Sequence, residues 1–267
     1  MIRKPAVAGQ FYPADKKNLE QEVNKYLQVK AIPQKVIGII APHAGYVFSG
    51  RVAGQVYAAT QVPEKCLVLS PNHTGQGARA AIMTEGSWSI PTGQIPVNSE
   101  LAQKLQTSCE IIKEDEQAHM FEHSLEVQLP FLLAKQPKLS IVPLTLGRLN
   151  FADCEKIGGA IADLIKEARE QILMVASSDL NHYENQEITE HKDKQAINKV
   201  LHMDPEGLLQ TCAQEKITMC GVIPTAIMLI AAKLLGAKHA KLIKHETSGD
   251  VCGDYSAVVG YAGIIVY

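Results

Sequence analysis

Three apolar segments of the chain are each followed within a few residues by a histidine. His43 follows VIGIIAP, His73 follows CLVLSPN, and His182 follows ILMVASSDLN. Neutral imidazole is the most common side-chain metal ligand, and it is also the usual general acid or base near neutral pH. Imidazoles from separate segments that meet at one place would therefore form a metal site or a proton-transfer site.

His43 and His73 share a local pattern, in which a proline precedes the histidine and a glycine lies two residues after it. Proline keeps the residue before it extended, and glycine permits a sharp turn or the close approach of a ligand. Either histidine alone could be a loop residue that bonds locally. The repetition of the pattern favours a metal site that both histidines share.

Cys220 precedes a glycine and an apolar segment that is typical of a buried helix. Because the helix dipole stabilises a thiolate at a helix N-terminus, Cys220 is a candidate soft metal ligand or nucleophile. The alternative is an inert buried thiol. The other five cysteines form no C-x-x-C pair, so we expect reduced thiols rather than disulfides.

Carboxylates accompany two histidines. Asp179 lies three residues before His182, where it could fix the imidazole tautomer and make the pair a catalytic acid–base pair; alternatively, Ser178 or Asp179 could cap a helix. His123 and Glu126 share one face if their segment is helical, and we expect them to contact a substrate or support the metal ligands. Surface positions are the alternative for this second pair.

The apolar segments before the histidines are too short for helices and are typical of buried strands. Strand-like runs lie at 36–40, 66–70, 139–146, 172–176, 240–244 and 257–266, and helical patterns lie at 15–27, 49–59, 99–105, 123–135, 151–168 and 223–235. The alternation predicts a three-layer α/β fold with a central, mostly parallel or mixed sheet and helices on both faces. Residues 84–99 are expected to form an excursion or hairpin. In such sheets ligands bind beyond the carboxyl ends of the strands, which is where the three histidines follow.

Composition limits the classes of protein. The chain has 267 residues, of which 46% are hydrophobic and 20% charged, with a net charge of −2. We expect one domain over 1–267. The absence of a basic excess argues against nucleic-acid binding, and no apolar stretch is long enough to span a bilayer. The N-terminal residues lack the apolar core of a signal peptide, so we expect a soluble, cytoplasmic protein.

Five motifs together resemble the Memo family, whose bacterial and archaeal members are also called AmmeMemoRadiSam system protein B. They are APHAGY at 41–46, SPNH at 70–73, EHSLEVQLP at 122–130, SSDLNH at 177–182 and MCGVIP at 219–224. The family resembles class III extradiol dioxygenases in fold. The resemblance implies that His43, His73 and Cys220 bind a metal, that His182 beside Asp179 is the acid–base residue, and that His123 lies in the pocket.

The resemblance also implies cofactors and partners. Family members are associated with iron or copper and with redox chemistry, the animal member with phosphotyrosine peptides, and the prokaryotic members with a radical-SAM enzyme and an AMMECR-type protein. Ring-opening dioxygenases of this fold use two histidines and a glutamate. Cys220 stands at the third position here, and a thiolate favours Cu(I), Zn(II) or thiolate-bound iron, so activity on catechols does not carry over.

Three functions remain open at this point. The first is a mononuclear metal oxidoreductase, with Fe(II) as the first choice and copper or zinc as alternatives, that acts on an unknown small molecule or peptide. The second is a non-catalytic metal-binding or peptide-binding accessory protein. The third is acyl transfer by Cys220 as nucleophile and His182 as base, which requires hydrogen-bond contact between them.

Overall fold

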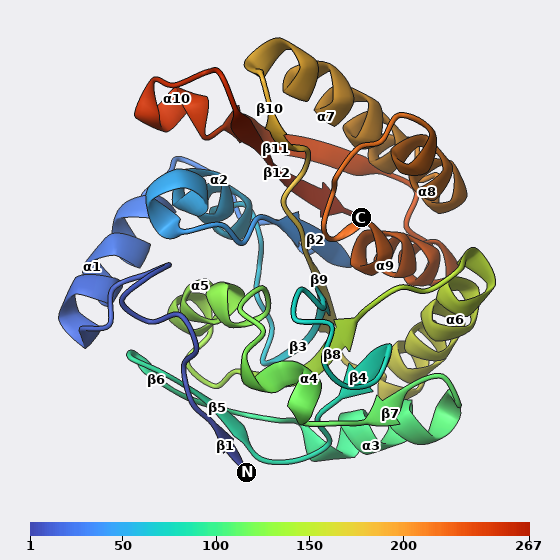
Figure 1. Cartoon of the computed structure of the whole chain (residues 1–267). Coiled ribbons are helices and arrows are strands. Elements are labelled where there is room, and N and C mark those ends of the chain that lie inside the picture. Colours follow the sequence, from blue (N-terminus) through green and yellow to red (C-terminus); the bar gives the residue numbers. More distant parts are fainter.

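The computed structural model, which describes residues 1–267, is built around a mixed sheet of nine strands (Figure 1). In chain order they are β2 (Gly38–Ala41), β3 (Lys65–Pro71), β4 (Ala80–Ile82), β7 (Lys113–Glu114), β8 (Ser140–Leu146), β9 (Ile172–Ser177), β10 (His182–Glu184), β11 (Ala240–Thr247) and β12 (Val258–Val266). The order across the sheet is β10-β12-β2-β9-β3-β8-β4-β7, with β11 paired to β12.

The central strands β2, β9, β3 and β8 run parallel and in register. Ile40 of β2 and Leu69 of β3 both pair with Ala176 of β9. These strands are buried along almost their whole length, as expected for Val/Ile/Leu-rich strands covered on both faces. The flanking strands β12 and β4 are antiparallel to β2 and β8, so the predicted mixed sheet is confirmed. Parallel alignment brings the carboxyl ends of the four central strands to one edge.

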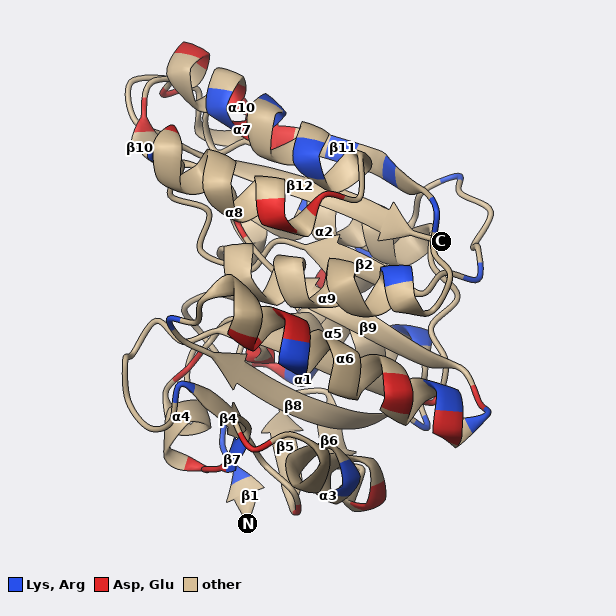
Figure 2. Ribbon diagram, turned by 90° about the vertical axis from the view of Figure 1, so that its right-hand side faces the viewer, with Lys and Arg blue, Asp and Glu red and all other residues tan.

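Helices cover both faces of the sheet and complete the predicted three layers. One face carries α1 (Lys16–Leu27), α2 (Tyr46–Ala58) and α5 (Leu129–Lys135), and the other carries α3 (Ser99–Ser108), α6 (Phe151–Ala168), α7 (Gln186–Leu201), α8 (Pro205–Gln214) and α9 (Val222–Leu234). Figure 2 shows α6 to α9 in front of the sheet, with most charged residues on helices and loops while β8 and β9 carry none. The short elements are α4 (Gln117–Met120), the 3-10 helix η1 (Glu126–Gln128) and α10 (Gly249–Cys252).

A second, small sheet lies beside the main one. It contains β1 (Ile2–Arg3), β5 (Ser87–Ile90) and β6 (Gly93–Pro96), in the order β1-β5-β6. The antiparallel pair β5 and β6 confirms the hairpin expected within 84–99, and β1 pairs with β5 in parallel. The N-terminal residues are thereby fixed against a segment more than eighty positions along the chain.

Local signals explain two helix starts. Asp15 caps α1 by accepting a hydrogen bond from the backbone N–H of Asn18 at 2.9 Å. Asn150 and Asp153 form a reciprocal capping box at the start of α6, which spans the expected 151–168. Side chains of this kind satisfy N–H groups that the helix itself leaves unpaired.

One expectation about local structure and one alternative are wrong. The segment 123–135 is not one helix, because η1 precedes α5 and His123 lies before both. Consequently His123 and Glu126 do not share a helical face. Ser178 and Asp179 do not cap a helix, since the chain continues from them into β10. A run of Ser, Ser, Asp and Asn favours helix caps and loops alike, and here it forms a loop.

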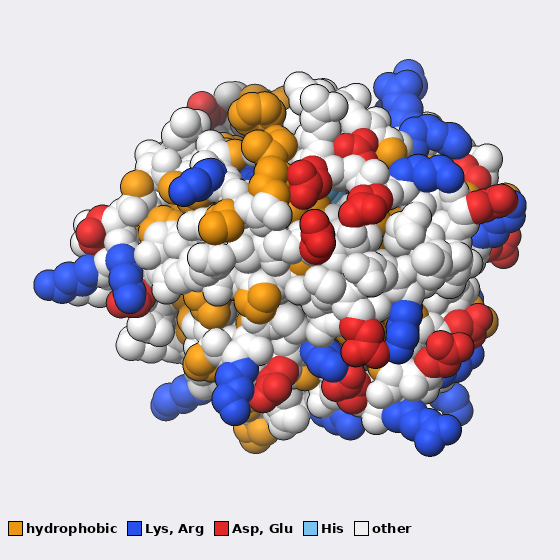
Figure 3. Space-filling model, turned by 90° about the horizontal axis from the view of Figure 1, so that it is seen from below, with side chains coloured by type: hydrophobic (Ala, Val, Ile, Leu, Met, Phe, Trp, Pro, Cys, Tyr) orange, Lys and Arg blue, Asp and Glu red, His pale blue; other side chains and the backbone are white.

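The surface carries both signs of charge. On the face seen from below in Figure 3, Lys and Arg side chains are interspersed with Asp and Glu, with scattered hydrophobic side chains among them. This distribution agrees with the net charge of −2. None of the helices combines the length and apolar character that crossing a bilayer requires.

Candidate metal centre

Three histidines converge at the carboxyl edge of the parallel strands. His43 lies two residues beyond β2 and His73 two residues beyond β3, and their ring centroids are 5.2 Å apart. His123 stacks on His73 with centroids 4.8 Å apart and lies 5.5 Å from His43. One ring nitrogen from each histidine lies within 4.8 Å of the other two, so the group could hold one metal ion. His43 is buried, whereas the His73 side chain is 35% exposed.

Hydrogen bonds from strand ends hold the loop that carries His43. The backbone N–H of Ser178 donates to the carbonyl of Ala41 at 2.9 Å, which extends the pairing of β2 and β9 past the sheet. The Asp179 carboxylate then accepts from the backbone N–H of His43 at 2.8 Å. The position of His43 therefore follows from the parallel alignment of two strands that are far apart in sequence.

Ser177 determines which nitrogen of His43 carries hydrogen. The Ser177 hydroxyl donates to the carbonyl of Ser124 at 2.7 Å, so it can only accept from its other neighbours. Those are Nε2 of Gln128 at 2.8 Å and Nδ1 of His43 at 2.9 Å. Because the one hydroxyl hydrogen of Ser177 is already donated to Ser124, Nδ1 of His43 must be the donor in its contact with Ser177. Nε2 of neutral His43 therefore carries a lone pair that faces the centre.

Glu122 determines which ring nitrogen of His73 carries hydrogen. Its Oε1 lies 2.9 Å from Nδ1 of His73, and its Oε2 accepts from the backbone N–H of His73 at 2.6 Å. Burial of Glu122 opposes ionisation, but the hydrogen bonds from His73 and Ser124 outweigh it and lower the pKa to about 2. An ionised carboxylate only accepts, so Nδ1 of His73 is the donor. Nε2 of His73 is thereby left free as a metal ligand.

Cys220 reaches the centre from the start of α9. Its Sγ lies 3.2 Å from Nε2 of His43 and accepts from the backbone N–H of Asp179 at 3.3 Å. Gly221 makes this approach possible, since a Cβ there would lie 2.3 Å from the carbonyl oxygen of Ser177. Burial and then the neighbouring Asp179 raise the pKa of the Cys220 thiol. Burial outweighs the hydrogen bonds from Asp179, Ser178 and Gly221 that lower this pKa, so the thiol rather than the expected thiolate is favoured without a metal.

Asp179 serves His43 rather than His182. Its carboxylate bonds to the His43 backbone and places Oδ2 4.0 Å from Nε2 of His43, and no hydrogen bond joins it to His182. The expectation that Asp179 orients the His182 ring is therefore wrong. Burial raises the pKa of Asp179 to about 7, against backbone hydrogen bonds that lower it. A carboxyl group that titrates near neutral pH beside the metal ligands is suited to proton transfer.

His182 is half-buried at the start of β10. Its Nδ1 donates to the carbonyl of Thr218 at 3.0 Å, since a carbonyl only accepts, and this leaves a lone pair on Nε2. Burial lowers the pKa of His182, and His73 lowers it further. Cys220 contacts His43 instead of His182, so the Cys–His pair required for acyl transfer is not formed. The acid–base role of His182 remains a prediction.

Glu126 lies away from the pocket that it was expected to line. It is fully buried and pairs with Arg3, and it also accepts from the backbone N–H groups of Ala6 at 2.8 Å and Val7 at 3.2 Å. Tyr12 donates to the same carboxylate. Glu126 therefore anchors the N-terminal segment. His123, in contrast, lies in the pocket and packs on Phe11 at a centroid distance of 4.7 Å.

Sequence analysis missed Glu122, Ser177 and Gln128. Glu122 adjoins His123 in sequence, but its main partner, His73, is 49 residues away. Ser177 ends β9 and therefore lies at the same edge as the histidines, which was the available signal. Gln128 joins Ser177 to the Tyr57 hydroxyl, which donates to its amide oxygen at 2.8 Å. These three polar side chains are fully buried. Ser177 and Glu122 bond to the rings of His43 and His73, and Gln128 bonds to Ser177.

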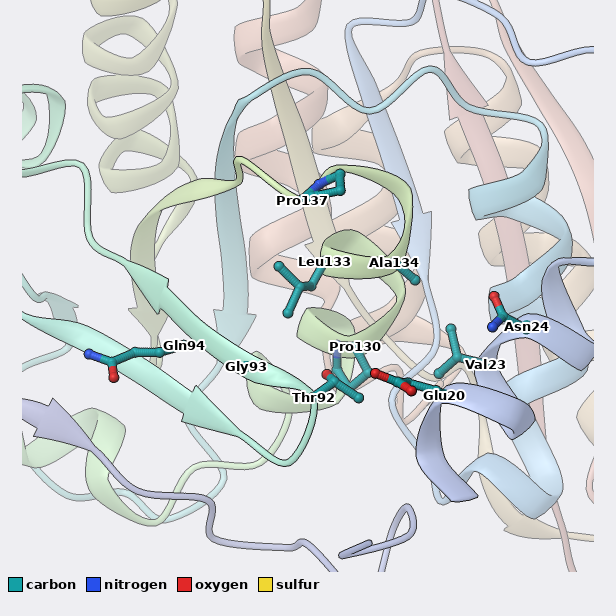
Figure 4. Close-up of a pocket in the computed structure, with 10 residues that line it drawn as sticks. All are labelled: Glu20, Val23, Asn24, Thr92, Gly93, Gln94, Pro130, Leu133, Ala134 and Pro137. Carbon is teal, nitrogen blue, oxygen red and sulfur yellow. The ribbon is translucent and has the colours of Figure 1, made fainter. Parts of the chain in front are cut away.

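A separate cleft of about 520 Å³ lies between α1, α5 and the β5–β6 hairpin (Figure 4). Glu20, Val23 and Asn24 of α1 face Thr92 and the helix α5 across it. None of the residues predicted for the metal site lines this cleft. This cleft is therefore separate from the candidate metal centre.

Comparison with known proteins gives the family. A family model described as Memo-like protein matches residues 3–265. The chain belongs to the Memo family. MEMO1 family proteins of Methanopyrus kandleri and Methanosarcina mazei are 39% and 41% identical to it, in each case over 99% of both chains. The MEMO1 family protein of Methanocaldococcus jannaschii is 41% identical, also over 99% of both chains.

A solved structure supports the fold independently. An uncharacterized protein of Escherichia coli K12 superimposes with a TM-score of 0.55, over 86% of this chain and 100% of that chain, at 14% sequence identity. At that identity the likeness extends to the three-layer α/β fold alone. The family resemblance noted in the sequence is thus confirmed by the family model and by the MEMO1 family relatives.

The residues present fit a transition metal. In His43 and His73 the contacts with Ser177 and Glu122 occupy Nδ1, so Nε2 is the ring nitrogen available to a metal. Such outer hydrogen bonds to ligating histidines are usual in metal sites. With Cys220 beside His43, the available donors are imidazole nitrogens and one sulfur, which suit zinc, copper and iron but not magnesium or calcium.

Proposed function

We propose that this Memo family protein is a mononuclear metal-dependent oxidoreductase. His43 and His73 hold the metal, and His123 and Cys220 complete the donor set. Iron is our first choice, with copper or zinc as alternatives, and the substrate is a small molecule or a peptide. A bound iron or copper ion supplies Lewis acidity and one-electron transfer.

One observation carries the proposal, namely the convergence of His43, His73 and His123 with Cys220 in contact with His43. The exposure of the centre supports a reactive role. The His73 side chain is 35% exposed, whereas structural zinc sites are closed by four protein ligands. An open side permits a substrate to approach.

Two groups of the chain could transfer protons at the centre. Asp179 lies 4.0 Å from Nε2 of His43, and its pKa of about 7 allows it to take or give a proton at neutral pH. His182 presents its Nε2 lone pair and is neutral because burial lowers its pKa. We assign His182 to proton transfer with the substrate and Asp179 to the protonation of the ligand set.

The test begins with metal analysis of protein purified under anaerobic conditions. One equivalent of iron or copper is expected in the wild type and in the exposed-histidine control His202→Ala, and none in His43→Ala/His73→Ala. The same preparations are then assayed for oxygen consumption with reductants and candidate substrates. Metal that persists after loss of both histidines contradicts the assignment, and a loaded wild type without redox activity contradicts the oxidoreductase.

A second candidate is an accessory protein that binds metal or peptide without turnover, together with a radical-SAM enzyme and an AMMECR-type protein. Exposed aromatic side chains beside the centre favour it. Phe121, two residues before His123, is 66% exposed, and Tyr183, next to His182, is 78% exposed. Exposed aromatic residues are enriched where proteins contact partners.

Pull-down with the two partner proteins separates this candidate from the first. An accessory protein should capture at least one partner and lose it in Phe121→Ser/Tyr183→Ser, with metal content unchanged. Capture that is insensitive to both substitutions, or no capture at all, contradicts the accessory role.

A further inference from the structure

We propose that Glu122 is a positioning residue for the metal centre, which locks the His73 ring with Nδ1 as donor and Nε2 toward the metal, and also draws His123 toward the same carboxylate. The inference rests on the proposed metal site, but it concerns a residue that makes no direct contact with a metal. It therefore has tests that do not depend on activity.

The contacts of Glu122 are concentrated on two of the histidines. Oε1 lies 2.9 Å from Nδ1 of His73 and 3.6 Å from Nδ1 of His123. Oε2 accepts from the backbone N–H of His73 at 2.6 Å, so ring and backbone of His73 are held by one side chain. The two rings stack with an interplanar angle of 19°. One carboxylate thus holds His73 by two hydrogen bonds and lies within ion-pair distance of His123.

Only a carboxylate satisfies this environment. In addition to the His73 groups, Oε1 accepts from the backbone N–H of Ser124 at 3.0 Å and from its hydroxyl at 2.7 Å. Each of the two carboxylate oxygens faces a backbone N–H group, that of His73 or that of Ser124, which can only donate, and the Glu122 side chain is 0% exposed. A glutamine would direct an NH2 group at donors in a buried site, which is costly because no water can compensate.

Arg3 holds the segment that carries Glu122. Its Nη2 donates to the backbone carbonyl of Glu122 at 2.6 Å, and its Nε donates to the carbonyl of His119 at 3.1 Å. The guanidinium lies 4.4 Å from the centroid of the Trp88 ring. Arg3 is fully buried, so the N-terminal segment holds the backbone of Glu122 in place. The orientation of His73 is thus supported through two successive layers of buried contacts.

The first test uses the metal-free wild type. Nitrogen-15 NMR of the histidine rings near neutral pH distinguishes a protonated Nδ1 from a protonated Nε2. The proposal requires His73 to carry its hydrogen on Nδ1. The His73 signals are assigned by their loss in His73→Ala. A hydrogen on Nε2, or an even mixture of tautomers, overturns the proposal, and this outcome needs neither a metal nor a Glu122 variant.

The second test measures zinc affinity by competition with a chromophoric chelator. Glu122→Gln is expected to weaken Zn²⁺ binding by about 10-fold to 100-fold, the range found when outer partners of ligating histidines are lost. Glu246→Gln is the matched control, because Glu246 is also a buried carboxylate but accepts from Arg51 at 2.9 Å and contacts none of His43, His73 and His123. Equal affinity in Glu122→Gln and wild type overturns the proposal.

The shared role of Glu122 is tested by a double-mutant cycle. If one carboxylate positions both rings, Glu122→Gln costs less zinc affinity in the His123→Ala background than in the wild type. Equal losses in both backgrounds overturn the part of the proposal that concerns His123. A wild type that binds no metal refutes the proposed function, while the tautomer of His73 still decides the role of Glu122.

Discussion

Nε2 of His43 lies 3.2 Å from Sγ of Cys220, although 177 positions separate the two residues in the chain. Nδ1 of His43 is already used as a donor to Ser177, so the thiol hydrogen of Cys220 points to Nε2 or to the Asp179 carbonyl, which lies 3.6 Å away. Metal binding at this pair must displace that hydrogen, because the thiolate is the form of cysteine that binds metals.

We therefore expect proton release when the metal binds. Burial raises the pKa of Cys220, so the thiol is protonated in the metal-free protein at neutral pH. Calorimetric titration with Zn²⁺ in two buffers of different ionisation enthalpy should show about one more proton released by the wild type than by Cys220→Ser. Equal proton release by the two proteins would contradict a thiolate ligand.

Asp179→Asn is expected to stabilise the metal-free protein at high pH. The folded pKa of about 7 lies above the unfolded value, so the stability that protonated Asp179 contributes is present at low pH and is lost as the pH rises toward 7. The advantage of Asp179→Asn over wild type should therefore grow by about 3 kcal/mol between about pH 5 and about pH 8.

Urea unfolding at both pH values measures this difference. Asp193→Asn provides a control, since Asp193 is also fully buried but pairs with His245 at 2.8 Å. An advantage of Asp179→Asn that is the same at both pH values would show that Asp179 titrates normally in the folded protein.

Glu126→Gln should destabilise the fold, because it leaves the buried Arg3 guanidinium without its counter-charge. Removing one partner of a buried ion pair costs about 3–5 kcal/mol. Arg51→Ala breaks the pair with Glu246, in which Arg51 is 53% exposed, and should cost less than about 1 kcal/mol. Similar unfolding free energies for the two variants would refute the anchoring role of Glu126.

Gly221→Ala should destabilise the protein by about 1–3 kcal/mol, because the added methyl group would lie 2.3 Å from the Ser177 carbonyl oxygen and push α9 from β9. Gly159→Ala is the matched control. Gly159 lies inside α6 with nothing within 4 Å of an added Cβ, so the substitution should stabilise the protein by about 0.5–1 kcal/mol. Thermal unfolding of both variants measures these changes in stability. Zinc affinity is expected to fall in Gly221→Ala and to stay unchanged in Gly159→Ala.

The positions of the strand-end histidines could be predicted from the sequence on two grounds. The short Val/Ile/Leu runs before His43 and His73 indicate buried parallel strands, and parallel strands present their carboxyl ends at one edge. The position of His43 and His73 at that edge then follows without knowledge of side-chain contacts. The same logic predicted β9, although the role of Ser177 at its end was not recognised.

The partners of the histidines could not be predicted in this way. Glu122 meets His73 only because the loop after α4 folds back across the end of β3, and no periodicity in one sequence reports such a contact. The choice of Asp179 between His43 and His182 depends on the course of a loop of polar residues. Helix α7 was missed because its buried residues, among them Ala196 and Val200, are sparse in a strongly charged segment.

X-ray absorption spectroscopy of the metal-loaded protein tests most directly whether these residues hold one metal. Nitrogen ligands at about 2.0–2.1 Å together with one sulfur at about 2.3 Å are expected for zinc bound by the imidazoles and Cys220, with the sulfur absent in Cys220→Ser. A first coordination shell of oxygen alone, or a spectrum unchanged in His43→Ala/His73→Ala, would contradict the centre.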